Sequence, residues 1–370
     1  MTFRRESDLN IVSIGGGTGL STLLSGLKAR VRPAHPAAPQ GEQGSIDTLT
    51  AVVTVTDDGG SSGRLREEFQ ILPPGDIRNC MVALAEDEHL LTRLFQYRFE
   101  SEGDLSGHSF GNIFLAALTG VTDDFLEAIK LTSEVLAIKG RIFPATMKDA
   151  SLVAELEDGR IINGETRIVR ARSRIKKLWL SDPDCSPLPE TLEAIANADI
   201  ITVGPGSLYT SIVPNLLVSG IVEAIKSSRA VKFCIANIMT QPGETDGFSV
   251  EDHLRVIGEY SPGLVFDYVV VNNAPISPLL KDKYLSEGAI QVELADPHGF
   301  RTGSAGPKVI AANLLNDGGL VRHDSLKLAN LLIDAYCSSL GVAEDQTDVG
   351  SGCVATIADA GGNGTQPRRG

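Results

Sequence analysis

The chain has 370 residues, of which 42% are hydrophobic and 22% charged, so it can bury a large core as a single α/β domain. Its formal net charge of −14 argues against nucleic acid or an anionic membrane as partner, because binding a phosphate polymer needs a basic face. A small anionic ligand remains compatible, since a few backbone N–H groups and arginines suffice to hold it.

Neither the ends of the chain nor its cysteines point to export or to a membrane. No stretch of about 18 apolar residues occurs, and the richest candidate, Ile212–Val222, contains Pro214 and Asn215. The N-terminus lacks the apolar centre of a signal peptide. The five cysteines are scattered without a CxxC pair, which is typical of reduced thiols. We therefore expect a cytoplasmic protein without membrane insertion.

Composition predicts one folded domain, residues 10–340, between two disordered ends. Residues 1–9 are polar, and residues 341–370 contain too few apolar side chains to bury a core. A segment rich in alanine and proline predicts an insertion loop at residues 31–45.

Short apolar runs alternate with helical patterns along this domain, as they do in a doubly wound sheet. The pattern predicts a Rossmann-like three-layer α/β/α fold with a mainly parallel sheet. The expected strands are Asn10–Ile14, Leu49–Thr56, Asp199–Val203, Val231–Ala236 and Asp267–Asn272. The expected helices are Leu20–Lys28, Leu208–Lys226 with a break at Pro214, Val250–Glu259 and Ser325–Leu340.

The segment from about residue 76 to 180 does not follow this alternation. Its first part, to residue 138, reads as helical throughout. Arg141–Leu156 and Arg160–Leu180 then alternate around the turn Glu157-Asp158-Gly159. We expect a helical and β-hairpin addition to the main sheet.

The first motif with chemical meaning is Ile11–Leu24, in which a strand runs into a glycine-rich loop and then a helix. Such a loop lets the backbone approach a phosphate at a helix N-terminus. Leu20 replaces the last glycine of a dinucleotide fingerprint, and no lysine follows as in a P-loop. A tight turn alone would explain one glycine, not four in five residues. The expected phosphate-binding residues are Gly15, Gly16, Gly17, Thr18 and Gly19.

Two further motifs contribute carboxylates. Asp57 and Asp58 follow a buried strand, at the sheet edge where ligands bind, and could hold Mg²⁺ or a ribose hydroxyl. An Asp-Gly turn with a serine cap is the simpler alternative. Asp76, in the motif LPPGDIRN, is better explained from sequence alone as a helix N-cap.

The motif Ser106–Asn112 matches GxSxG, but the polar segment Glu100–Leu105 before it is no strand, so a nucleophile elbow is rejected. We expect Ser109 or Asn112 to open a helix, with the side chains of His108 and Asn112 free to contact a ligand.

A second strand–loop–helix motif, Ile201–Ser211, predicts another phosphate- or sugar-binding edge at Gly204, Gly206 and Ser207. Asn237 and other polar residues after the next two strands extend this rim. Tyr284 could stack on a base and Arg322 could pair with a diphosphate, although surface roles explain both equally well.

Together these motifs, with ANIMTQPGETDGFS and VRHD, resemble the YvcK-type gluconeogenesis factors, bacterial relatives of the 2-phospho-L-lactate transferases (the CofD-like family). The match runs in order over roughly residues 10–340. The resemblance implies a protein that binds UDP-sugars, UDP-N-acetylglucosamine among them, and supports central carbon metabolism, cell shape and wall synthesis without an assigned reaction. In the transferase branch the glycine loop holds a guanosine-type nucleotide and aspartates hold a metal.

Carried over to this chain, the resemblance implies a metal, possible Mg²⁺, at Asp58 and Asp76, and nucleotide-sugar contacts at Tyr284 and Arg322. No flavin or haem is expected. A homo-oligomer, dimer or higher, is the expected assembly. Ser325, beside Arg322, is a candidate for phosphorylation by a Ser/Thr kinase, although serines at helix starts are usually caps.

Three functions therefore compete. The first is a UDP-sugar-binding regulator. The second is a Mg²⁺-dependent phospholactyl- or phosphoryl-type transferase working through Asp58. The third, a nicotinamide dehydrogenase, is weakened by Leu20 and by the lack of a catalytic His/Lys pair.

Overall fold

A computed structural model describes residues 8–32, 45–86, 90–100, 102–295, 306–340 and 356–357. Most of the predicted insertion loop lies outside the described residues, and so do the two predicted disordered ends apart from residues 8–9 and 356–357.

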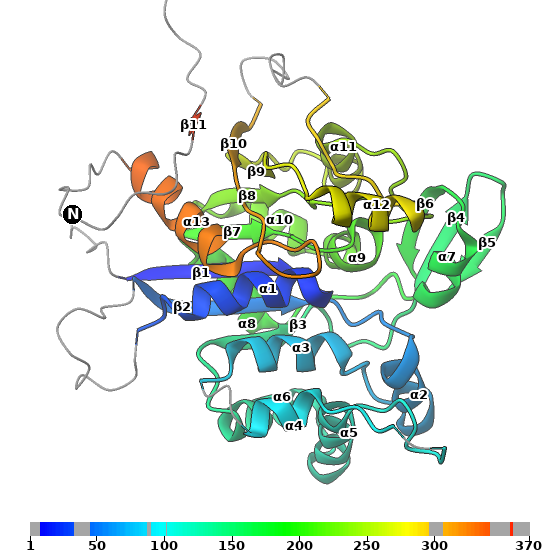
Figure 1. Ribbon diagram of the computed structural model, residues 1–370. Helices are drawn as coiled ribbons and strands as arrows, with labels where there is room; N and C mark the ends of the chain where they lie inside the picture. Colours follow the sequence, from blue (N-terminus) through cyan, green and yellow to red (C-terminus); the bar gives the residue numbers. More distant parts are fainter. Residues whose placement is uncertain are drawn as a thin grey trace, which may run out of the picture.

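The centre of the molecule is one sheet with the strand order β11-β10-β9-β8-β7-β1-β2-β3, in which the seven strands from β10 to β3 are parallel and β11 runs antiparallel at the edge. In Figure 1 the N-terminal strands β1 and β2 lie towards the β3 edge of this sheet. Its strands are β1 (Leu9–Gly15), β2 (Ile46–Val53), β3 (Arg141–Pro144), β7 (Ile200–Val203), β8 (Val231–Ile235), β9 (Tyr268–Asn272), β10 (Lys308–Ala312) and β11 (Thr356–Ile357).

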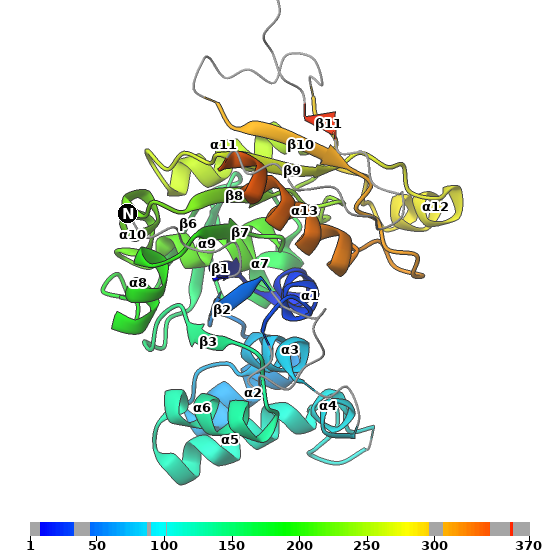
Figure 2. The same cartoon turned by 90° about the vertical axis from the view of Figure 1, so that its left-hand side faces the viewer.

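Helices cover both faces of this sheet, which confirms the three-layer α/β/α prediction (Figure 2). Ile11 of β1 packs in one hydrophobic core and the next residue, Val12, in the other, because side chains alternate across a strand. The first core is covered by α1 (Gly17–Lys28), α3 (Gly75–Leu84) and α13 (Ser325–Ser339). The second is covered by α8 (Pro189–Ala196), the π-helical turn η1 (Leu208–Ile212), α9 (Val213–Leu217), α10 (Ile221–Ser227) and α11 (Val250–Tyr260).

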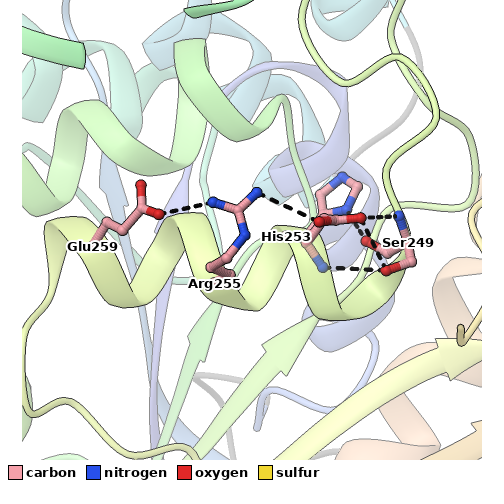
Figure 3. Close-up of polar contacts among 5 residues, drawn as sticks. Ser249, His253, Arg255 and Glu259 are labelled. Carbon is pink, nitrogen blue, oxygen red and sulfur yellow. Dashed lines mark hydrogen bonds and ion pairs between the residues drawn. The ribbon is translucent and has the colours of Figure 1, made fainter. Parts of the chain in front are cut away.

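The start of α11 shows how a short sequence pattern fixes the residue at which a helix begins. Ser249 and Asp252 form a capping box: Asp252 N donates to Ser249 Oγ (3.2 Å), and Ser249 N donates to Asp252 Oδ2 (3.0 Å). Further along the exposed face of the helix, Arg255 pairs with Glu259 at 2.8 Å (Figure 3). His253, one turn into the helix, is buried, and its Nδ1 lies 2.7 Å from Ser249 O (Figure 3).

The predicted helical and hairpin addition is present but differs in its strands. Arg141–Pro144 is β3 and pairs in parallel with β2, since Ile142 and Phe143 are buried against the main sheet. The turn at residues 157–160 joins β4 (Leu152–Leu156) to β5 (Ile161–Asn163), and β6 (Ile175–Leu180) completes a three-stranded antiparallel sheet after the short helix α7 (Glu165–Ala171). The remaining helices are α2 (Gly60–Phe69), α4 (Leu90–Gln96), α5 (Phe110–Thr122), α6 (Phe125–Val135) and α12 (Pro278–Ser286).

Two other details correct the sequence prediction. Pro214 does not break its helix: it lies in the first turn of α9, directly after the π-helical turn η1, and the break falls at residues 218–220. In the described part of the chain no single helix is long and apolar enough to cross a membrane, although the pair Leu208–Leu217 and Ile221–Ser227, bent by 79°, qualifies by length and composition.

Candidate functional site

The chain order of the strands places a crevice between β1 and β7. From β1 the chain proceeds to β2 and β3 on one side, whereas β7 leads to β8, β9 and β10 on the other. Ligands of open α/β sheets bind at such a switch point, outside the carboxyl ends of the strands. Both glycine loops of the sequence leave the sheet there, one after β1 and one after β7.

The first loop forms the N-terminus of α1. Gly16 is the N-cap in an extended conformation and, being glycine, supplies no capping side chain. Gly17 follows at φ +61°, a conformation that favours glycine. A helix N-terminus offers N–H groups and the positive end of its dipole to an anion, and in α1 the N–H of Gly17 is already bonded to Asp76 Oδ2.

Gly19 brings the two loops into contact. A Cβ atom at this position would lie 2.5 Å from the backbone oxygen of Pro205 in the second loop. The absent side chain therefore lets the loops touch, and it explains a glycine that the turn itself does not require.

The second loop, after β7, is held by amide side chains. Gly206 N donates to Asn237 Oδ1 (3.2 Å), and Asn237 Nδ2 donates to Gly206 O (2.8 Å). Gln241 Nε2 donates to Ser207 Oγ (2.7 Å). Asn237, which follows the next strand, β8, thus positions the second loop. The sequence pattern did not distinguish this role from contact with a ligand.

The two loops enclose a cavity of about 210 Å³. A second cavity, of about 740 Å³, lies on the α3–α4 side of α1. Thr18, Thr22, Arg322 and His323 line both. Of the residues expected from sequence, the first cavity brings together Gly16, Gly17, Thr18, Gly19, Gly206, Ser207, Asn237 and Arg322. Gly15 and Gly204 lie just behind it, tied to the neighbouring strands by hydrogen bonds from Thr54 N to Gly15 O and from Gly204 N to Ile14 O.

Arg322 and Tyr284 are linked through the loop before α13. Arg322 is exposed and lines both cavities. Tyr284, on α12, does not line them; its hydroxyl accepts a hydrogen bond from Val321 N at 3.1 Å. Tyr284 therefore contacts the residue next to Arg322.

Beside the first loop lies a cluster of carboxylates, Asp57, Asp58, Asp76, Glu165 and Glu244. The N-cap of α3 is Pro74 and the helix begins at Gly75, so Asp76 is not the N-cap expected from sequence. Its Oδ2 instead accepts a hydrogen bond from Gly17 N at 2.8 Å. Burial, then the charge of Asp57, raises the pKa of Asp76 to about 6.

The other members of the cluster are also buried or bound. Asp58 Oδ1 accepts from Thr166 N (2.8 Å), in the first turn of α7. Burial raises the pKa of Glu165 well above its usual value, and the charges of Asp57 and Asp76 raise it further. In the described ranges no three or more His, Cys, Asp or Glu side chains are arranged to hold a metal ion. Mg²⁺ usually takes only one or two protein carboxylates, with water and phosphate oxygens, so the donors present are compatible with it.

The motif around Ser109 is structural. Ser109 is the N-cap of α5 and accepts from Asn112 N (3.2 Å), one of the two expected possibilities. The expectation that the side chains of His108 and Asn112 are free is wrong, because both are buried. Arg78 Nε donates to Asn112 Oδ1 (3.2 Å), and His108 Nδ1 lies 3.0 Å from Ser61 Oγ.

Sequence reasoning missed Glu165, Glu244 and His323. Glu165 follows a strand of the addition, and no local pattern connects it with the Asp57-Asp58 motif. His323 belongs to the motif VRHD, which the sequence analysis identified. It was not named there as a candidate, and its burial is seen only in the structure.

Comparisons with known proteins show the family to which the chain belongs. The family profile described as 2-phospho-L-lactate transferase CofD matches residues 11–315. The chain belongs to the CofD family.

Within the CofD family, the chain is similar to proteins named gluconeogenesis factor. That of Halalkalibacterium halodurans is 46% identical over 88% of this chain and 96% of the relative, and that of Bacillus subtilis is 44% identical over 88% and 97%. The crystal structure of a UPF0052 family member from Bacillus halodurans, 46% identical, superposes with a TM-score of 0.80 over 88% of this chain and 99% of that one. The resemblance seen in the sequence is thereby confirmed at the level of the family.

Proposed function

We propose that this CofD-family chain is a nucleotide-sugar-binding regulatory protein that holds a UDP-sugar, such as UDP-N-acetylglucosamine, in the crevice between β1 and β7. The observation that carries the proposal is the convergence of two glycine loops and Arg322 on one cavity. The N-terminus of α1, apart from the Gly17 N–H that is bonded to Asp76, suits the diphosphate, and the guanidinium of Arg322 suits its charge.

The names of the relatives support the regulatory part of this proposal. The match with this chain covers nearly the whole length of two proteins named gluconeogenesis factor. We accordingly propose a role in central carbon metabolism, cell shape and wall synthesis, in the cytoplasm and as a homo-oligomer. Light scattering on the purified protein tests the assembly.

Calorimetry tests the ligand. Titration of the full chain with UDP-N-acetylglucosamine should give saturable heat, and Arg322→Gln should weaken binding at least 10-fold because a charge-assisted contact to phosphate is lost. Arg229→Gln, at an exposed arginine in the loop before β8, is the matched control and should bind as the wild type does. Absence of heat at millimolar UDP-N-acetylglucosamine would end this proposal.

A second candidate is favoured by the carboxylates beside the first loop. Asp57 and Asp76 are close enough that the charge of one raises the pKa of the other, and a cation would relieve this repulsion. Asp58 and Asp76 are then the proposed Mg²⁺ ligands of a phospholactyl- or phosphoryl-type transferase, with Mg²⁺ supplying charge stabilisation for a transferring phosphate.

This candidate has its own measurement. Phosphorus NMR should detect Mg²⁺-dependent turnover of a nucleotide substrate, and Asp58→Asn should abolish it while the exposed Asp282→Asn leaves it unchanged. Turnover that persists in Asp58→Asn contradicts the transferase assignment.

A further inference from the structure

The second cavity lies between α1, α3, α4 and the loop before α13, and most of its lining is polar. Along α1 the lining residues carry hydroxyl groups and are spaced three and four residues apart, which places them on one face of the helix: Thr18, Ser21, Thr22 and Ser25. Asn79 of α3 and Gln96 of α4 add amide groups. Hydroxyl and amide groups suit a sugar better than a planar base, which stacks on apolar or aromatic side chains.

The cavity carries positive charge, although the chain as a whole has a net charge of −14. Lys28, Arg93 and Arg322 line it, and Asp324 is the one acidic residue among its described lining residues. The Asp324 carboxylate already accepts from Lys327 N at 2.9 Å and pairs with Lys327 Nζ at 3.5 Å. Cations that the protein does not neutralise itself raise the local concentration of an anionic ligand.

Arg93 is the cation in this cavity that has no other evident role. Arg322 also lines the first cavity, and Lys28 Nζ donates to Ala85 O at 2.9 Å. Arg93, on α4, is exposed, and its guanidinium has no hydrogen bond or ion pair to the residues that the structure describes. A guanidinium presents a planar fork of N–H donors that matches a carboxylate or a phosphate.

A ligand held at the glycine loops can extend into this cavity. Thr18, Thr22, Arg322 and His323 line both cavities, which therefore adjoin along the first turn of α1. The first cavity, of about 210 Å³, suits a diphosphate. The second, of about 740 Å³, lies within the range of roughly 300–1,000 Å³ that is usual for a site holding a whole small molecule. One hexose beyond the diphosphate would therefore leave part of the second cavity unfilled.

We propose that the second cavity takes the sugar end of the ligand and that Arg93 binds a carboxylate carried by that sugar, so that the site prefers an acidic nucleotide sugar to a neutral one. The inference rests on the proposed function, since it assumes that the glycine loops hold the diphosphate. N-acetylmuramic acid, in which a lactyl ether adds a carboxylate to N-acetylglucosamine, and glucuronic acid are sugars of this class. Arg93 is then a specificity-determining residue for the bound sugar.

Two pairs of ligands isolate the carboxylate. UDP-N-acetylmuramic acid differs from UDP-N-acetylglucosamine only by the lactyl ether, and UDP-glucuronic acid differs from UDP-glucose only at C6. Calorimetry on the full chain should show the acidic member of at least one pair binding roughly 3- to 10-fold more tightly than the neutral member. This range lies between the effect of an exposed ion pair and that of a buried charge-assisted hydrogen bond. The pair that shows the gain identifies the position of the carboxylate on the sugar.

Variants of Arg93 assign the gain to its guanidinium. Arg93→Gln should remove the preference for the acidic sugar and leave the affinity for the neutral sugars unchanged, because the diphosphate contacts stay in place. Arg93→Lys should keep part of the preference, since it retains the charge and loses the planar fork. Arg229→Gln, at the exposed arginine before β8, is the control and should show the preference of the wild type.

The two proposals fail in different ways. A wild type that binds the acidic member of neither pair more tightly overturns the inference and leaves UDP-sugar binding intact, and so does an Arg93→Gln protein that keeps the preference of the wild type. A wild type that binds none of the four ligands overturns the proposed function and this inference together.

Discussion

Gly26 of α1 lies directly against the backbone of Ser325, the first residue of α13. A Cβ atom at Gly26 would come within 1.9 Å of the Ser325 carbonyl oxygen and 3.2 Å of Ala329 Cβ. The two helices can therefore approach only because residue 26 has no side chain. Arg322 and His323, which immediately precede α13, line the two cavities together with Thr18 and Thr22 of α1.

Gly26→Ala should separate the two helices. Overpacking of this kind costs about 1–3 kcal/mol of unfolding free energy, and the displacement should also weaken binding of UDP-N-acetylglucosamine by moving Arg322. Thermal unfolding and calorimetry measure the two effects. The control is Gly258→Ala in α11, where a Cβ meets nothing within 4 Å and helix propensity predicts a gain of up to about 1 kcal/mol. Equal behaviour of the two variants would contradict the packing argument.

Gly19→Ala should abolish phosphate binding while leaving the fold intact. Its Cβ would collide with Pro205 O of the second loop and force the loops apart, so we expect at least a 10-fold loss of affinity for pyrophosphate. Gly15→Ala, four residues earlier, is the control, because its Cβ would meet only ordinary contacts at 3.6 and 3.7 Å. If Gly19→Ala retained pyrophosphate binding and Gly15→Ala lost it, the close contact of Gly19 with Pro205 would not be what binding requires.

Glu244→Gln should flatten the dependence of stability on pH. Glu244 is 4% exposed, and burial raises its pKa from 4.5 to about 7. Because the folded value is the higher one, the stability that Glu244 contributes is fully present below pH about 4.5 and is lost as pH rises through about 7.

The variant, which cannot ionise, should therefore exceed the wild type by up to about 3 kcal/mol at pH 8 and match it near pH 5. Urea unfolding at both pH values gives the comparison. Glu287→Gln, at an exposed glutamate after α12, should follow the wild type at each pH. A constant difference across this range would show that Glu244 is ionised in the folded protein.

A negative charge at Ser325 should weaken binding of an anionic ligand. Ser325 lines the second cavity together with Arg322, and it follows the N-cap Asp324. A glutamate in the first turn of α13 is compatible with the helix dipole, so Ser325→Glu should fold normally while it opposes Arg322.

We expect Ser325→Glu to bind UDP-N-acetylglucosamine roughly 3- to 10-fold more weakly, by calorimetry. Ser338→Glu, near the end of the same helix and exposed, should bind as the wild type does. Phosphorylation by a Ser/Thr kinase remains a proposal, which mass spectrometry of the protein from its own cells tests. An unchanged affinity in Ser325→Glu would remove the electrostatic reason for such control.

How far the sequence leads can be judged from particular elements. The strand before Gly15 and the one before Gly204 were predicted because both are continuous apolar runs bounded by glycines, a purely local signal. β3 was assigned to a hairpin and β10 was not predicted, since short alternating runs do not specify the strand with which they pair. Asp76 was interpreted as a cap because its partner, Gly17 N, lies 59 residues away in the chain.

The glycine loops, the parallel sheet and the candidate residue Arg322 could thus be predicted from the sequence. Backbone conformation and burial produce patterns among residues that are close together in the chain. Tertiary structure alone decided that Gly19 touches Pro205, that Asn237 holds the second loop, and that Nε2 of His323 is buried without a partner among the described residues. These relationships join segments that packing brings together. Whether a polar atom is satisfied depends on every neighbour around it, and a linear sequence does not contain that information.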